Sequence, residues 1–188
     1  EKLTDKVCGS NKNIVDKPIV LNIYSHTCPD LTLVDLPGIT RIPIAGQVQN
    51  IEEVTKGICR KYCGDPMTII LCVLPANADL STSDGLQMAQ QLDPTGARTI
   101  GVITKIDIMD QGTNAKNMLE NKEIPLLHGY VGVKNRSKQD IIDQLSVDEA
   151  HEKERKYFAT NKTYVSMDQS LLGIGNLTAK LTKIMFFH

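Results

Sequence analysis

Three short apolar runs constrain the fold of this chain more than any other feature. They are TIILCVL (68–74), RTIGVIT (98–104) and YVGVK (130–134), and residues with helical spacing fill the sequence between them. A continuous apolar run is typical of a strand that is covered on both faces. Strands that alternate with helices indicate an α/β fold. We therefore expect a mostly parallel sheet flanked by helices.

The N-terminal third adds two shorter strand patterns and one helix pattern. Lys17–Ser25 alternates apolar and polar residues, and the apolar Leu31–Val34 follows closely, which together predict an antiparallel hairpin at the edge of a mixed sheet. Asn50 and Glu53 have the spacing of a capping box, and apolar residues recur at helical intervals after them. This pattern predicts a helix that begins near residue 50.

Charge and cysteine content narrow the classes of partner and compartment. The chain has 21 Lys and Arg against 22 Asp and Glu, so no long-range field favours a nucleic acid polymer or an anionic membrane. Its apolar runs are too short to span a bilayer, and its first residues, EKLTDK, do not resemble a secretion signal. Five cysteines without a pairing pattern favour reduced thiols. We therefore expect a cytoplasmic protein.

Polar motifs follow three of the expected strands. They are DLPG (35–38), TKID (104–107) and NRS (135–137). In sheets of this class, ligands bind at the carboxyl ends of the strands. These motifs are therefore the candidate functional residues of the chain.

The TKID motif carries chemistry that suits guanine. The carboxylate of Asp107 accepts hydrogen bonds and donates none. Guanine offers two adjacent donors on its Watson–Crick edge, whereas adenine has an acceptor there, so a carboxylate selects guanine. Lys105 has a flexible stem that fits along the plane of a base. On its own, so short a motif also fits a solvated loop.

The other two motifs suit phosphate and loop support. Asp35 is placed to hold a Mg²⁺-bound water, and Gly38 lets its backbone N–H approach a γ-phosphate, although the same four residues also fit a plain turn. Asn135 and Arg136 are placed to support the base-binding loop, although Ser137 also fits a helix cap. The three motifs together, each at a strand end, favour a guanine-nucleotide domain.

Longer stretches give a more specific resemblance. LTLVDLPGITRIP, PANADLSTSDGLQMA, DPTGARTIGVITKIDIMDQGT and GYVGVKNRS resemble the GTPase domain of the dynamin family of large GTPases, from about Lys6 to Phe158. The resemblance implies a three-layer, Ras-like GTPase domain that is incomplete at its N-terminus. It also implies that the complete protein hydrolyses GTP with Mg²⁺, self-assembles, and remodels or divides membranes that it contacts through regions outside this chain. The implied location is cytoplasmic and peripheral to membranes.

The same resemblance implies roles for individual residues and limits for the domains. Asp35 and Gly38 correspond to the γ-phosphate switch, with Asp35 reaching Mg²⁺ through water, and Asp79 corresponds to a catalytic residue that acts across the dimer of GTPase domains. We expect residues 1–160 to form the partial GTPase domain, and residues 161–188 to be a linker and the start of a neck helix. The expected nucleotide-binding residues, for GTP or GDP, are Asp35, Leu36, Pro37, Gly38, Thr104, Lys105, Asp107, Asp110, Asn135, Arg136 and Ser137.

Two departures set limits on activity. The sequence has no G-x-x-x-x-G-K-[ST] motif and no Gly-Lys dipeptide, so the phosphate loop of the family is missing from it. Ile39 follows DLPG where small Ras-like GTPases have a water-orienting Gln. We therefore expect the isolated chain to be inactive. The alternative is a non-catalytic pseudo-GTPase module that dimerises through the same surface.

The C-terminus has an apolar stripe that allows two interpretations. Leu177, Leu181 and Ile184 recur at helical spacing, with Phe187 a step further on. One interpretation is a terminal helix that packs on its own core. The interpretation that the resemblance favours is a neck helix, whose stripe would pack on segments outside this chain.

Overall fold

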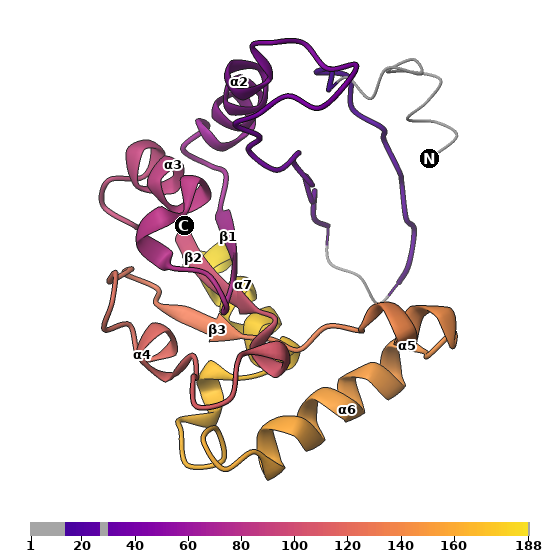
Figure 1. Cartoon of the computed structure of the whole chain (residues 1–188). Coiled ribbons are helices and arrows are strands. Elements are labelled where there is room, and N and C mark those ends of the chain that lie inside the picture. Colours follow the sequence, from indigo (N-terminus) through magenta and orange to yellow (C-terminus); the bar gives the residue numbers. More distant parts are fainter. Residues whose placement is uncertain (1–13, 27–29, 188) are drawn as a thin grey trace. The chain divides into compact units, whose positions relative to one another are not determined.

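The computed structural model describes residues 14–26 and 30–187, with the side chain of Phe187 left out. The chain divides between Thr68 and Ile69 into two compact units. Figure 1 follows the chain through both units.

The first unit contains the helix α2 (Ile51–Cys63). Acidic residues lie in its first turn and basic residues in its last turn, as the helix dipole favours. The predicted helix is therefore confirmed. The predicted capping box is wrong, because the side chain of Asn50 makes no cap hydrogen bond.

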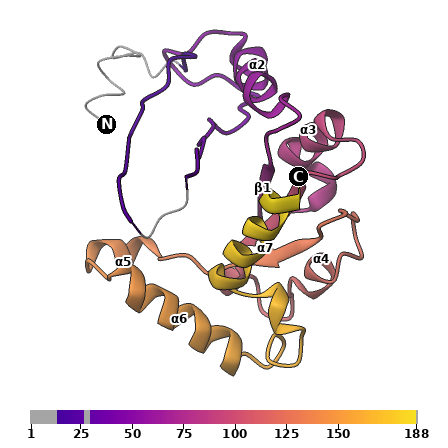
Figure 2. The same ribbon diagram turned by 180° about the vertical axis from the view of Figure 1, so that it is seen from behind.

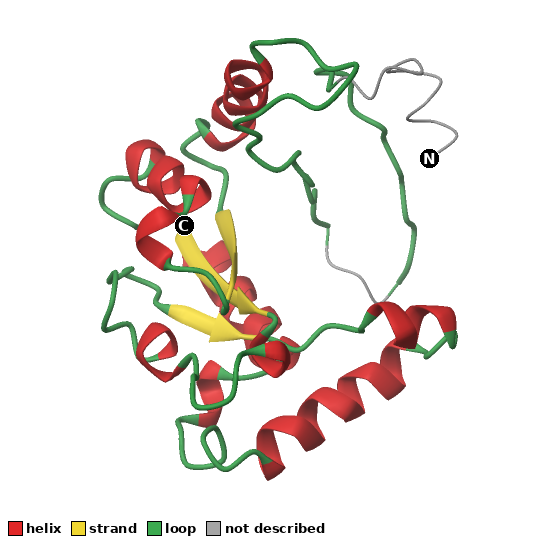
Figure 3. Cartoon of the chain, in the orientation of Figure 1, coloured by secondary structure: helices red, strands yellow, loops and turns green. Residues whose placement is uncertain are grey.

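The hairpin predicted in this unit is also wrong for the residues that the structure describes. Residues 14–26 and 30–50 form no strand (Figure 3). Leu21 is 79% exposed and Leu33 is 84% exposed, so the apolar side chains at these two positions are not packed against another part of the protein. A strand needs a neighbour for its backbone N–H and C=O groups, and the alternation of side chains does not specify that neighbour. Part of the expected turn, residues 27–29, lies outside the described residues.

The second unit contains a parallel sheet. Its strands are β1 (Ile70–Pro75), β2 (Thr99–Thr104) and β3 (Tyr130–Gly132), in the order β1-β2-β3. In the register, Cys72 lies opposite Gly101, which lies opposite Tyr130. The structure therefore confirms an α/β fold with a parallel sheet, while the antiparallel edge is missing from the residues described.

Helices cover both faces of this sheet. Helices α3 (Asp84–Leu92) and α4 (Lys116–Leu119) lie on one face, and α7 (Ile174–Phe187) lies on the other (Figures 1 and 2). The remaining elements are η1 (Leu80–Thr82), η2 (Ile106–Ile108), α5 (Lys138–Ile142), α6 (Val147–Thr160) and η3 (Gln169–Leu171), where η denotes a 3₁₀ turn.

The larger core lies on the α3 and α4 face, and it depends on two glycines. A Cβ atom on Gly101 would collide with the ring of Tyr130. A Cβ atom on Gly132 would lie 2.6 Å from the δ-methyl of Ile106. Burial raises the pKa of Tyr130 to about 12, and its hydroxyl donates to the carbonyl of Ile124 at 2.7 Å. The two glycines therefore let large side chains lie directly on the sheet.

Strand β1 is covered on one face only, which corrects the sequence prediction. Cys72 and Leu74 are buried, but Leu71 is 43% exposed and Val73 is 58% exposed. These two residues are in register with Ile100 and Val102 of β2, which α7 covers. An apolar run therefore fits a half-covered edge strand as well as a fully buried one.

Helix α7 packs on the sheet through the apolar stripe that the sequence shows. Leu177 and Ile184 are buried, and Leu181 is partly buried against the same cluster. Their neighbours include Val102 and Val131 of the sheet. The interpretation of a terminal helix on its own core is the one that the structure shows. The domain limit at residue 160 remains a prediction.

None of the helices in the described part of the chain combines the length and the apolar character needed to cross a membrane.

Candidate functional site

The TKID motif forms the turn that leaves the central strand. Thr104 ends β2, where its hydroxyl donates to the carbonyl of Leu74 at 3.3 Å and its own carbonyl accepts from the N–H of Ala76 at 2.8 Å. Lys105 has the left-handed angles φ 58° and ψ 26°, which are uncommon for a residue with a side chain. The turn η2 follows directly and carries Asp107. The backbone conformation of this turn therefore sets the position of Asp107 just beyond the end of β2.

Asp107 forms an ion pair with a residue from the neighbouring strand end. The ammonium of Lys134 lies 3.3 Å from Oδ2 of Asp107. The two side chains are only 17% (Lys134) and 22% (Asp107) exposed. Because β2 and β3 are parallel neighbours, their carboxyl ends bring the two loops together. The structure thus confirms that the second and third motifs follow adjacent strands.

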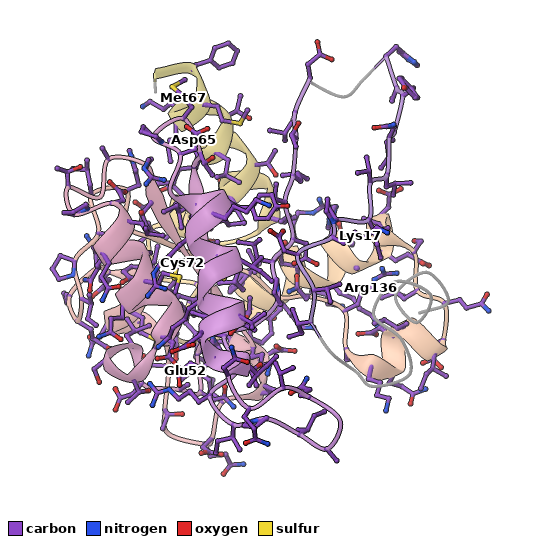
Figure 4. All side chains as sticks on the ribbon, turned by 90° about the horizontal axis from the view of Figure 1, so that it is seen from above. Lys17, Glu52, Asp65, Met67, Cys72 and Arg136 are labelled. Atoms are coloured by element: carbon purple, nitrogen blue, oxygen red, sulfur yellow. The ribbon has the colours of Figure 1, made fainter. Side chains whose placement is uncertain are left out.

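The NRS motif leads into the short helix α5. Arg136, labelled in Figure 4, donates from Nη1 to the carbonyl of Leu145 at 2.9 Å. Ser137 caps α5 in a capping box with Asp140. Hydrogen bonds from Lys153 and Ser137 hold the pKa of Asp140 far below its usual range. Ser137 therefore has a structural role as a cap, while the nucleotide roles of Asn135, Arg136 and Ser137 remain predictions.

Helix α6 makes hydrogen bonds to both of the loops that carry Asp107 and Lys134. The carboxylate of Glu154 is buried and accepts the N–H of Lys134 at 2.8 Å and that of Ile174 at 2.9 Å. The hydroxyl of Tyr157 donates to the carbonyl of Ile106 at 3.3 Å. Burial, with smaller effects of Tyr164 and Asp107, raises the pKa of Tyr157 to about 12, so this hydroxyl keeps its proton. Sequence reasoning missed Glu154, although an acidic residue four positions before the apolar Phe158 lies on the same helix face.

Asp79 and Asp110 lie in loops beyond strand ends, and their side chains are exposed. The carbonyl of Asp79 accepts from both the N–H and the hydroxyl of Thr82, at 3.2 and 2.9 Å. The carbonyl of Asp110 accepts in the same way from Thr113. Asp79 also lines a cavity of about 190 Å³ together with Leu74. Both carboxylates are therefore accessible to a partner or a ligand.

The DLPG motif belongs to the first unit, so the joining of all three motifs in one site remains a prediction. The carbonyl of Pro37 accepts from the thiol of Cys59 at 3.9 Å, and that of Gly38 accepts from the hydroxyl of Thr40 at 3.2 Å. A Cβ atom on Gly38 would meet nothing within 4 Å. Packing among the described residues therefore does not require glycine here, and the predicted approach of its N–H to a γ-phosphate remains a prediction.

The polar side chains of the three motifs fit a guanine base better than they fit a metal ion or a triphosphate. Asp107 presents an acceptor-only carboxylate, as the base requires. Among the described residues, no group of three or more His, Cys, Asp or Glu side chains could hold a metal ion. Mg²⁺ that keeps most of its waters needs only one or two carboxylates, and the role of Asp35 as the residue that holds such a water remains a prediction. A triphosphate would find no phosphate-loop lysine among these residues, because the sequence has no Gly-Lys dipeptide.

Comparisons with known proteins agree with the sequence resemblance. The model described as "Dynamin family" matches residues 1–106, and the one described as "Dynamin central region" matches residues 114–188. The chain is 46% identical over its full length to Dynamin-related protein 3B of Arabidopsis thaliana. It is also 46% identical over its full length to Dynamin-B of Dictyostelium discoideum. It is 48% identical to Dynamin-2 of Bos taurus over 87% of the chain.

The matched regions are a small part of these relatives. They cover 24% of the Arabidopsis protein, 20% of the Dictyostelium protein and 19% of the bovine protein. The chain therefore spans between 19% and 24% of the length of these three relatives.

Proposed function

The chain belongs to the dynamin family, and from that premise we propose that it contributes the guanine-binding part of a dynamin-like large GTPase. The observation that carries this proposal is the position of Asp107. Its carboxylate lies just beyond the central strand β2 and is held by Lys134 at 3.3 Å.

Recognition of guanine follows from the hydrogen-bonding capacity of this carboxylate. The two oxygens of Asp107 accept from the ring N–H and the exocyclic amine of guanine. Adenine has an acceptor nitrogen in place of the ring N–H and a C–H in place of the exocyclic amine, so neither oxygen receives a hydrogen bond and adenine is rejected. Thr104 and Lys105 set the turn, and the stem of Lys105 is available to lie along the base.

The wider activity is proposed for the complete protein. There, Mg²⁺ would neutralise charge on the phosphates of GTP, and Asp35 would hold a water of that ion. Asp79 would act across a dimer of GTPase domains, which its exposed loop position allows. Hydrolysis would drive self-assembly and the remodelling or division of membranes reached through other regions, in a cytoplasmic protein that is peripheral to the membrane.

The test of base recognition uses Asp107→Asn in this chain. Binding of GMP and of xanthosine monophosphate is followed by ¹⁵N NMR titration, which detects weak binding. Xanthine has a carbonyl where guanine has its amine, so an amide that donates suits xanthine better. We expect the variant to lose affinity for GMP and to gain relative affinity for the xanthine nucleotide.

The matched control is Asp148→Asn, which removes the same charge from an exposed position in the first turn of α6. It should leave both affinities unchanged. An unchanged preference between the two nucleotides in Asp107→Asn would remove Asp107 from the base site.

A second candidate function is a non-catalytic interaction module. On this alternative the surface that carries Asp79 serves dimerisation without hydrolysis, and the residues of this chain bind no triphosphate because they include no Gly-Lys dipeptide. This candidate predicts that the chain self-associates and that added GMP does not alter its NMR spectrum. The titration above therefore separates the two functions.

A further inference from the structure

We propose that Lys134 is a positioning residue for guanine recognition: it orients the carboxylate of Asp107, and helix α6 holds Lys134 in place through Glu154. This inference rests on the proposed function and adds to it a residue that sets base specificity.

Lys134 and Asp107 meet where two parallel strands end. Lys134 follows β3, whose ladder with β2 continues through a hydrogen bond from the N–H of Val133 to the carbonyl of Ile103 at 2.9 Å. From this position its ammonium reaches Oδ2 of Asp107 at 3.3 Å. The side chains are less than a quarter exposed, so solvent and salt screen this pair less than a fully exposed one. The pair therefore restricts the rotation of Asp107.

Helix α6 holds the backbone of Lys134 through Glu154. Glu154 is 3% exposed, and its two carboxylate oxygens accept the N–H groups of Lys134 and Ile174. It therefore ties the end of β3 to the start of α7. Tyr157, three residues later on α6, holds the carbonyl of Ile106. One face of α6 thus fixes both loops that carry the ion pair.

The ion pair leaves Asp107 able to bind a base. Each carboxylate oxygen can accept two hydrogen bonds. The ammonium of Lys134 forms an ion pair with Oδ2 alone, so acceptor positions on both oxygens are left for the two donors of guanine. Since Lys134 donates only, it cannot bind those donors itself, and it acts through Asp107. A carboxylate already held in one plane loses less conformational entropy when it binds the base.

The test compares Lys134→Met with Lys134→Arg in this chain, by the same titration with GMP and xanthosine monophosphate. Met keeps the length and removes the charge, so we expect affinity for GMP to fall about three- to tenfold and the preference for GMP to narrow. Arg restores a cation that pairs with a carboxylate, so Lys134→Arg should recover most of the affinity for GMP and most of the preference for GMP over xanthosine monophosphate. Lys138→Met removes a charge from an exposed residue of α5 and should change neither value.

Failure of this inference is distinguishable from failure of the proposed function. If Asp107→Asn abolishes GMP binding while Lys134→Met leaves affinity and preference unchanged, the inference is overturned and the function stands. If the unmodified chain binds no GMP, the function fails. The ¹³C resonance of the Asp107 carboxyl group in the free chain then decides the positioning role: a shift in Lys134→Met that Lys134→Arg reverses supports it, and an unchanged resonance overturns it. Should Lys134→Met not fold, Lys134→Gln takes its place.

Discussion

Asp93 shows how one carboxylate fixes the turn between α3 and β2. It is 5% exposed, and it accepts the N–H groups of Ala97 and Arg98 at 3.1 and 3.0 Å and the hydroxyl of Thr99 at 2.6 Å. Burial acts to raise the pKa of Asp93, but the hydrogen bonds from Thr99 and Arg98, with the charge of Arg98, outweigh it, and the pKa is lowered overall. The carboxylate is therefore more stable ionised in the folded chain than in the unfolded chain.

Asp93→Asn should destabilise the fold by about 1–3 kcal/mol near pH 7, because an amide cannot accept all of these hydrogen bonds. A lowered folded-state pKa contributes stability that is complete above the unfolded value, near pH 4, and is lost as the pH falls through the folded value. The difference in unfolding free energy between the two proteins should therefore narrow below about pH 4. Urea unfolding across this range measures it, and a constant difference would contradict the account.

At the scale of elements, α7 is the helix that closes the second face of the sheet. Its buried Leu177 contacts the cluster that contains Val102 and Val131, whereas Phe186 on the same helix is 83% exposed. A helix that belonged to a separate neck would leave Leu177 without this cluster. The stability of the sheet therefore depends on the last segment of the chain.

Leu177→Ala should lower the free energy of unfolding by about 2–4 kcal/mol, because it removes buried methyl groups and leaves a cavity. Phe186→Ala, which removes more apolar surface from an exposed position, should change it by less than about 0.5 kcal/mol. Denaturant unfolding of the two variants measures both values. Equal effects, or no effect of Leu177→Ala, would show that α7 is not docked in solution.

At the scale of the whole molecule, structural units and family matches divide the chain differently. The first matched family region ends at residue 106, and the second begins at residue 114. Both limits lie in the connection that follows β2. The structure keeps β2, β3 and α7 in one unit, which begins at Ile69. The boundary between the matched regions is therefore not a boundary between folded units.

The isolated chain should release negligible phosphate from GTP, because it has no lysine-bearing phosphate loop to bind the triphosphate. Phosphate release with added Mg²⁺ measures this, with Asp35→Ala as the companion variant. Turnover that Asp35→Ala abolishes would contradict the expectation and would show that the chain contains a working catalytic site.

Much of the second unit was predictable from local sequence patterns. Apolar runs located β1, β2 and β3 to within a few residues, and the position of Asp107 after such a run placed it at the carboxyl end of the sheet. The helix α2 was predictable from its periodicity in the same way. These features depend on residues close together in the sequence, so the sequence by itself determines them.

Tertiary structure decided the rest, because it depends on which segments find partners. The alternation in Lys17–Ser25 resembles a strand, but no neighbour pairs with it in the described residues. The stripe on α7 fits a neck helix as well as a core helix, and only the cluster around Val131 distinguishes them. Lys134 and Glu154 belong to no motif. Two parallel strands bring Lys134 to Asp107, and helix α6 brings Glu154 to the N–H of Lys134.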